Sequence, residues 1–163
     1  MNQLPIRIVC LLLTTCSYLG AVEPREALAD FKQTAKKDDF EAVWKKMLKL
    51  PGLPPETQEI YRDKVRKGMT RFKEGADFEI IGQKVDGDCA VIVINEIKGL
   101  DKKAANYDPI YLLKQEGEWK FFPSLSSFRQ AAQVAPETVE KFERLQAWYD
   151  EQEEILKHRP VSE

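Results

Sequence analysis

The sequence predicts an α+β protein in which an antiparallel sheet is preceded and followed by helices. Two consecutive β-hairpin patterns indicate the sheet: DFEIIGQKVDGDCAVIVINEI at residues 77–97 and YDPIYLLKQEGEWKFFP at residues 107–123. Ahead of these hairpins, and again after residue 135, apolar residues recur at helical spacing instead of alternating. This change of periodicity along the chain predicts the fold class.

Two short helices are expected first. Pro24–Ala35 forms one, because proline suits the first turn of a helix and Leu28 and Phe31 follow at helical spacing. The next begins at Asp38, an N-cap residue with Glu41 three positions later, which approximates a capping box. Its apolar stripe consists of Phe40, Val43, Trp44, Met47 and Leu48. We expect Pro51-Gly52 to end it.

A third helix is expected from Pro54-Pro55-Glu56 to the residue before Gly75. Its apolar residues are Tyr61, Val65, Met69 and Phe72, at spacings of four, four and three. A helix with such a stripe buries that face against its neighbours. We therefore expect this helix to pack on the sheet.

The first hairpin consists of a strand starting at Phe78, a tight turn at Asp86-Gly87 and a strand from Cys89 to Ile94. The residues of this second strand are apolar on both faces, which predicts a central strand covered on both sides. The second hairpin pairs 110–114 with 119–122 through Glu116-Gly117, with Pro109 and Pro123 at strand ends. Residues 98–106 form a polar loop.

The C-terminal part contains an acidic helix, predicted from Pro136 to about Lys157. Its apolar residues near one face are Val139, Phe142, Leu145, Tyr149 and Leu156. This helix is the best candidate to cover the second face of the sheet, and it would then fill any pocket on that face. Residues 124–134 fit an edge strand, a short helix or a loop, and residues 159–163 form a tail.

Residues 1–21 have the layout of a secretory signal peptide: one basic residue, Arg7, then an apolar run, then Gly20-Ala21 before the first charges. Cleavage after Ala21 would leave a single domain over residues 22–158 and an exported protein, periplasmic or secreted. Leu13-Thr14-Thr15-Cys16 also resembles a bacterial lipobox. Lipidation at Cys16 is the alternative, and it alone would attach the protein to a membrane.

The motifs KKDDFEAVWKKM (36–47), GDCAVIVIN (87–95) and PIYLLKQEGEWKFFP (109–123) resemble small exported bacterial proteins of the NTF2-like superfamily, including SnoaL-like domains. The resemblance covers roughly residues 24–130. It implies a curved antiparallel sheet wrapped around the N-terminal helices as a cone. A complete cone has about six strands, so four to six are expected here, and the C-terminal helix is an addition to the family's layout.

Several chemistries have no support in the sequence. The chain has one histidine and, after cleavage, one cysteine, Cys89, so no His/Cys metal site is expected and no cofactor is implied. Cys89 stands in an apolar strand, where a cysteine is usually a small core residue. The net charge of −2 gives no attraction to nucleic acid.

Asp108 is a weak candidate for catalysis. Enzymes of the superfamily often place an aspartate, tyrosine or histidine inside the cone, and Asp108 stands with Tyr107 and Tyr111 at the start of a predicted strand. A raised pKa would make its carboxylate a general base. Alternatively, an aspartate before Pro109 serves a turn. The candidates for lining a ligand pocket are Trp44, Tyr61, Phe72, Tyr111 and Trp119, and the competing interpretation is that they fill the helix–sheet core.

The sequence favours an exported, non-enzymatic binding or interaction module. Its partner would be a small apolar ligand, another protein or a second copy, because homodimers through the sheet are common in the superfamily that it resembles. A small acid–base enzyme of isomerase or dehydratase type is one alternative. A structural envelope protein whose last helix contacts a partner is another.

Overall fold

The computed structural model describes residues 22–49, 53–97, 106–122, 125, 128 and 134–158. The elements are helices α1 (Pro24–Lys36), α2 (Phe40–Lys46) and α3 (Pro55–Lys73), strands β1 (Asp77–Asp86), β2 (Cys89–Ile97), β3 (Tyr107–Gln115) and β4 (Glu118–Phe122), and helix α5 (Pro136–Lys157). The four strands form one antiparallel sheet in the order β1-β2-β3-β4. The predicted α+β class is confirmed. The described residues contain four strands, the lowest number in the expected range of four to six.

Some predictions fall outside the described residues. They concern the signal peptide at 1–21 with Cys16, the loop at 98–105, Pro123 and the tail after His158. Of the ambiguous stretch at 124–134, Leu125 and Phe128 are helical.

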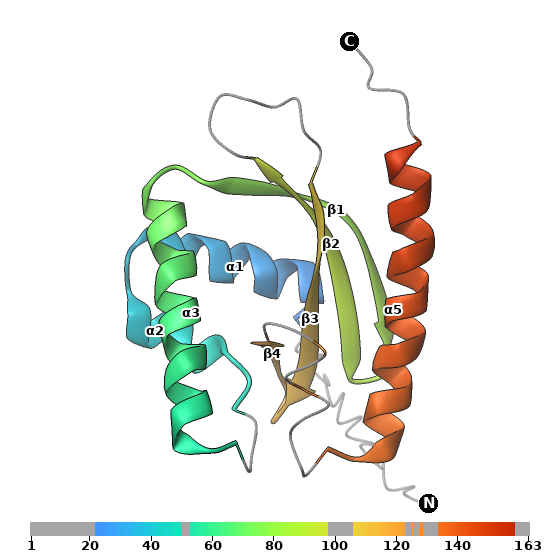
Figure 1. Ribbon diagram of the computed structural model, residues 1–163, viewed down its shortest axis with the longest axis horizontal. Helices are drawn as coiled ribbons and strands as arrows, with labels where there is room; N and C mark the ends of the chain where they lie inside the picture. Colours follow the sequence, from blue (N-terminus) through green and yellow to red (C-terminus); the bar gives the residue numbers. More distant parts are fainter. Residues whose placement is uncertain are drawn as a thin grey trace, which may run out of the picture.

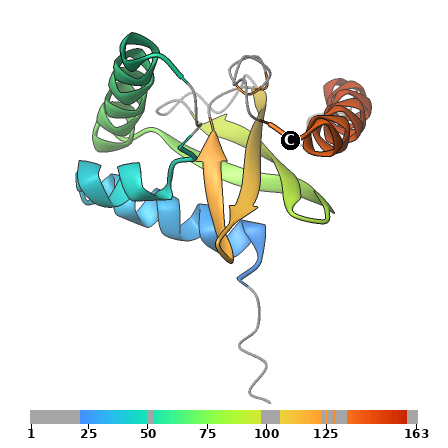
Figure 2. The ribbon, with the colours of Figure 1, turned by 90° about the horizontal axis from the view of Figure 1, so that it is seen from below.

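Helices cover both faces of the sheet. Figure 1 shows α1, α2 and α3 on one side and α5 alone on the other, and Figure 2 shows the same separation from below. The contacts of α5 with the sheet lie mainly on β2, followed by β1. The prediction that the C-terminal helix covers the second face is therefore confirmed.

Strand β2 supplies both halves of the core. Its residues from Cys89 to Ile94 are all buried, which confirms a central strand covered on both sides. Alternate side chains point in opposite directions: Ala90, Ile92 and Ile94 pack with α1–α3, whereas Val91 and Val93 pack with α5. A slip of one residue would exchange the two sets; because both sets are apolar, the register depends on the tight turn at Gly87-Asp88.

Tight turns set the hairpins. Gly87-Asp88 connects β1 to β2, one residue later than the predicted Asp86-Gly87, because Asp86 still pairs with Cys89. Gly87 has a φ of 63°, a conformation that glycine adopts without steric cost. Glu116-Gly117 connects β3 to β4 as predicted, and both residues have positive φ.

Helix α2 differs from its prediction at both ends. Its N-cap is Asp39, whose carboxylate accepts a hydrogen bond from the Ala42 N–H at 3.0 Å, whereas Asp38 has a φ of 60° outside the helix. Met47 and Leu48 are not helical. Met47 pairs with Phe121 in a parallel bridge, and the Leu48 N–H donates to the Phe121 carbonyl at 2.7 Å. Pairing with the outer edge of β4 thus ends the helix early.

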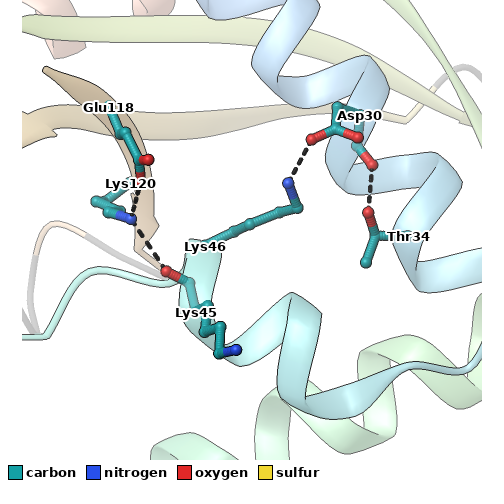
Figure 3. Close-up of polar contacts among 6 residues, drawn as sticks. All are labelled: Asp30, Thr34, Lys45, Lys46, Glu118 and Lys120. Carbon is teal, nitrogen blue, oxygen red and sulfur yellow. Dashed lines mark hydrogen bonds and ion pairs between the residues drawn. The ribbon is translucent and has the colours of Figure 1, made fainter.

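Polar contacts hold α2 between α1 and β4 (Figure 3). The Lys46 ammonium binds the Asp30 carboxylate on α1. On the other side, Lys120 of β4 donates to the Lys45 carbonyl at 3.1 Å and pairs with Glu118 at 2.5 Å. These contacts contribute little energy each, and those of Lys46 with Asp30 and of Lys120 with the Lys45 carbonyl connect α2 to its two neighbours.

Strand β3 begins at Tyr107, three residues before its predicted start, so that Pro109 lies inside a strand instead of at its end. Only the part from Tyr111 onward pairs with β4, where Tyr111 faces Phe122. Within the described part of the chain, residues 107–110 pair with β2 alone. Pro109 is tolerated because its missing N–H is on the unpaired side. The first half of β3 is therefore a short sheet edge.

Candidate functional site: a cavity between α3 and the open edge of β3

A cavity of about 630 Å³ lies between α3 and the sheet. Its walls come from α1, α3, the first residues of β1, the ends of β2 and β3, and α5. The lining residues are Phe31, Gly68, Arg71, Phe72, Ala76, Asp77, Phe78, Ile94, Glu96, Asp108, Pro109, Ile110, Tyr111, Leu125 and Gln146. This volume is in the range of small-molecule sites, and most of the lining side chains are apolar.

The sheet forms one wall of the cavity through residues that share a face. Ile94 of β2 is directly opposite Asp108 of β3, and Phe78 of β1 is opposite Glu96. Because side chains alternate along a strand, Ile110 lies on the same face as Asp108. Register alone thus brings two carboxylates and three apolar side chains to one end of the sheet.

The two carboxylates stand among polar partners. Glu96 forms an ion pair with Arg71 of α3, with Nη2 to Oε2 at 2.9 Å, which links α3 to β2 across the cavity. Asp108 accepts a hydrogen bond from the Asn106 side-chain amide at 2.8 Å. The cavity is therefore apolar in its interior and polar where β2 and β3 end.

A third carboxylate, Asp77, ties β1 to α1. Burial opposes ionisation, but hydrogen bonds from Lys32, from the Phe78 N–H and from Lys36 outweigh it and lower the pKa of Asp77 to about 2. The Lys32 ammonium also lies 4.8 Å from the centre of the Phe78 ring. Asp77 is ionised at neutral pH and holds α1 against the cavity wall.

The cavity extends around the open edge of β3 toward α5. Tyr111 lines it from the far side of the sheet, and its hydroxyl donates to the Gln146 side chain of α5. At the same edge the Tyr149 hydroxyl donates to the Tyr107 carbonyl at 2.7 Å. Burial, then the carboxylates of Glu153, Asp108 and Asp150, raise the pKa of Tyr149 to about 12. Tyr149 therefore stays a donor, and with Pro109 it blocks this edge for strand pairing.

Helix α5 leaves the cavity open. It packs on the opposite face of the sheet from α3, and it contributes only Gln146 to the described cavity lining (Figure 1). The expectation that the C-terminal helix would fill a pocket concerned the face that this helix covers, whereas this cavity lies mainly on the α1–α3 face.

The structure distributes the predicted pocket residues over different places. Phe72, Tyr111 and Asp108 line the cavity. Trp44 and Tyr61 pack edge to face at 5.3 Å, outside the cavity, and the Tyr61 hydroxyl donates to the Phe121 carbonyl. Trp119 lies at the other end of the sheet in a smaller cavity of about 240 Å³.

Arg71, Glu96 and Gly68 line the cavity without having been singled out in the sequence. Glu96 follows Ile92 and Ile94 at a period of two, which places all three on one face of β2. That signal was available from the sequence alone. The pairing with Arg71 was not, because it depends on how α3 crosses the sheet.

Cys89 is fully buried, and burial and then the neighbouring Asp88 carboxylate raise the pKa of its thiol to about 12. An unionised, buried thiol is a poor nucleophile. Over the described residues, no group of three or more His, Cys, Asp or Glu side chains is placed to hold a metal ion. In the same residues, no helix has the length and apolar character to cross a membrane.

No protein-family model and no curated protein matches the chain. Its fold is similar to that of two solved structures. One is a candidate NTF2-like transpeptidase from Campylobacter jejuni, with 16% sequence identity and a TM-score of 0.48 over 63% of this chain and 100% of that one. The other is an NTF2-like protein of unknown function from Cytophaga hutchinsonii, with 11% identity and a TM-score of 0.39 over 67% and 96%.

Proposed function

We propose that this protein is an exported, non-enzymatic binding module whose cavity between α3 and the sheet takes a small, mainly apolar ligand. The cavity itself carries the proposal: about 630 Å³, with an apolar interior and polar groups gathered at one end. Among the partners considered from the sequence, a small ligand is therefore favoured over a protein partner or a second copy.

Asp108 and Tyr111 both line the cavity, but the groups of the acid–base alternative leave β3 on opposite faces. Asp108 faces the α1–α3 side, together with Ile110 and Ile94. Along β3, Tyr107 and Tyr111 lie an odd number of positions from Asp108, so their side chains point to the opposite face. There they pack on the α5 side. The carboxylate and the tyrosines that an isomerase or dehydratase would combine thus leave the strand on opposite faces.

Export is supported by the layout of residues 1–21 and by how the chain continues after them. The Val22 carbonyl accepts a hydrogen bond from the Trp119 indole at 2.8 Å. Glu23 and Glu26 form a capping box that starts α1, and Pro24 is buried. The residues directly after the proposed cleavage site therefore belong to the domain. Mass spectrometry of the mature N-terminus tests this: a start at Val22 supports cleavage, and a lipid-modified Cys16 contradicts it.

A fluorescence titration tests the binding function. N-phenyl-1-naphthylamine is apolar and fluoresces strongly only away from water, so binding in the cavity increases its emission. Ala76→Leu places a larger side chain in the cavity lining and is expected to weaken binding at least tenfold.

Ala147→Leu is the matched control, because Ala147 is exposed on α5 and lies outside the lining. It is expected to bind the probe like the unmodified protein. Thermal unfolding of both variants shows whether they fold. Absence of binding by the unmodified protein, or equal binding by Ala76→Leu, contradicts the proposal.

A further inference from the structure

Gly68 lies on the inward face of α3 without a side chain to fill the space in front of it. Val65 precedes it by three residues and Phe72 follows it by four, so the three residues share one face of the helix. Glycine inside a helix is less stable than alanine. A Cβ atom at position 68 would meet no atom of another described segment within 4 Å, so crowding does not explain the glycine.

Two aromatic residues border this space together with Gly68. A second cavity of about 180 Å³ adjoins the larger one along α3, and its lining is mostly apolar. The residues that line both cavities are Phe31 of α1, Gly68 and Phe72. The place where the two cavities adjoin is therefore bounded by two rings and a bare stretch of helix backbone.

The two rings pack on other rings but not on each other. The Phe31 ring lies 4.8 Å from the ring of Phe121, and the Phe72 ring meets Phe78 edge to face at 5.8 Å, both measured between ring centres. Among the described ring pairs, Phe31 and Phe72 do not contact each other. Both side chains are only partly buried. Each ring thus keeps surface that the core does not cover, beside the open space at Gly68.

We propose that the ligand contains a flat aromatic ring, which lies over Gly68 and contacts the rings of Phe31 and Phe72. Aromatic rings attract each other in offset-stacked or edge-to-face arrangements, beyond what their buried area contributes. A flat ring can approach the backbone of a glycine closely, whereas any larger residue would hold the ring away. This inference rests on the proposed binding function and adds the class of ligand.

A comparison of 2-naphthol with decahydro-2-naphthol tests the ring. The two probes share a carbon skeleton and a hydroxyl group, and both are uncharged at neutral pH, but only 2-naphthol is flat and aromatic. The unmodified protein is expected to bind 2-naphthol about tenfold more tightly, because contacts between rings are added to the apolar burial. Isothermal titration calorimetry measures both affinities.

Phe72→Leu removes one of the two rings but keeps an apolar side chain. This variant is expected to lose most of the preference for 2-naphthol over its saturated form. Phe40→Leu is the matched control, because Phe40 is a partly buried ring on α2 that lines neither cavity. It should keep the preference of the unmodified protein.

Gly68→Leu places a side chain where the ring is expected. The affinity for 2-naphthol should fall about tenfold, since the ring can no longer reach the helix backbone. Thr70→Leu is the matched control, because Thr70 is exposed on the same helix and lines neither cavity. Thermal unfolding shows whether each variant folds, and the comparison of the two probes on the unmodified protein needs no variant.

The results separate this inference from the proposed function. If the unmodified protein binds decahydro-2-naphthol as tightly as 2-naphthol, the aromatic ring is wrong. If Phe72→Leu keeps the preference, or Gly68→Leu binds 2-naphthol as Thr70→Leu does, the place of the ring is wrong. If neither naphthol binds but N-phenyl-1-naphthylamine does, the inference fails while the binding function stands. If no probe binds, both proposals fail.

Discussion

The two faces of the sheet are built from the same strands but are covered in different ways. On the α5 face, one helix of 22 residues packs Phe142, Leu145 and Tyr149 against the sheet, and the rings of Phe122, Phe128 and Phe142 lie 4.8–5.0 Å apart. On the α1–α3 face, three helices divide the surface, and a cavity remains between α3 and the sheet. One face is closely packed, and the other leaves a cavity.

The largest expected effect concerns the closely packed face. Phe142 is 1% exposed and contacts the rings of Tyr111, Phe122 and Phe128, so Phe142→Ala should lower the free energy of unfolding by about 3–5 kcal/mol. Phe72 is only half-buried beside the cavity. Phe72→Ala should therefore lower the free energy of unfolding by clearly less, about 1–2 kcal/mol. Urea unfolding measures both. Equal losses would contradict the distinction between the two faces.

A smaller effect is expected where α1 is tied to the cavity wall. Asp77→Asn removes the carboxylate that binds Lys32 and Lys36, and we expect a loss of at most about 1 kcal/mol at neutral pH. The pKa of Asp77 is about 2 in the folded protein and ordinarily 3.8. Its contribution is therefore complete above pH 3.8 and is lost as the pH falls through about 2.

Urea unfolding at several pH values measures this dependence on the Asp77 carboxylate. The difference between Asp77→Asn and the unmodified protein should vanish near pH 2. Asp63→Asn is the control, because the pair that Asp63 forms with Arg66 is exposed and lies within one helix. A difference for Asp77→Asn that stays constant down to pH 2 would show that the carboxylate does not stabilise the fold by its charge.

Gly68→Ala should increase stability by about 0.5–1 kcal/mol, because alanine favours the helix and its methyl group meets open space. Thermal or urea unfolding measures the gain. Gly75→Ala is the opposite control, since Gly75 has a φ of 93° and a side chain there is strained. A loss of stability in Gly68→Ala would mean that the space above this residue is filled in the folded protein.

The smallest effect is expected at Cys89 on the α5 face. Because its thiol is fully buried with a pKa of about 12, a thiol reagent at pH 8 should leave Cys89 unmodified in the folded protein. In urea the same residue should react fully. Peptide mapping by mass spectrometry distinguishes Cys89 from the other cysteines. Rapid modification of the folded protein would show that α5 opens from the sheet.

Much of the fold could be predicted from local signals. The starts of α1, α3 and α5 follow prolines in the first turn, and the hairpins follow glycine turns at Gly87 and Gly117. The predictions are wrong where pairing with a segment far away in the sequence determines the local structure. Met47 and Leu48 continue the apolar pattern of a helix, but pairing with Phe121 draws them out of it. Tyr107–Pro109 extends β3 because β2 provides a partner.

The candidate site was predictable only in part. Phe72, Tyr111 and Asp108 were selected from the sequence and line the cavity, while Trp44 and Tyr61 pack against each other outside it. An aromatic residue on the apolar face of a helix has the same sequence pattern whether it lines a cavity or packs in the core. The alternation along β3 is enough to separate Asp108 from the two tyrosines on sequence grounds alone, because a period of two places neighbours on opposite faces.

The sequence by itself determined the type and order of the elements, the turn of the second hairpin and the apolar character of both faces of β2. These properties depend on periodicity and on turn residues, which act over a few positions along the chain. The cover of one face by α5 was also predicted, but only the tertiary structure decided that a cavity remains between α3 and the sheet on the other. A cavity is the space that packing leaves between segments far apart in the sequence, and no local pattern encodes it.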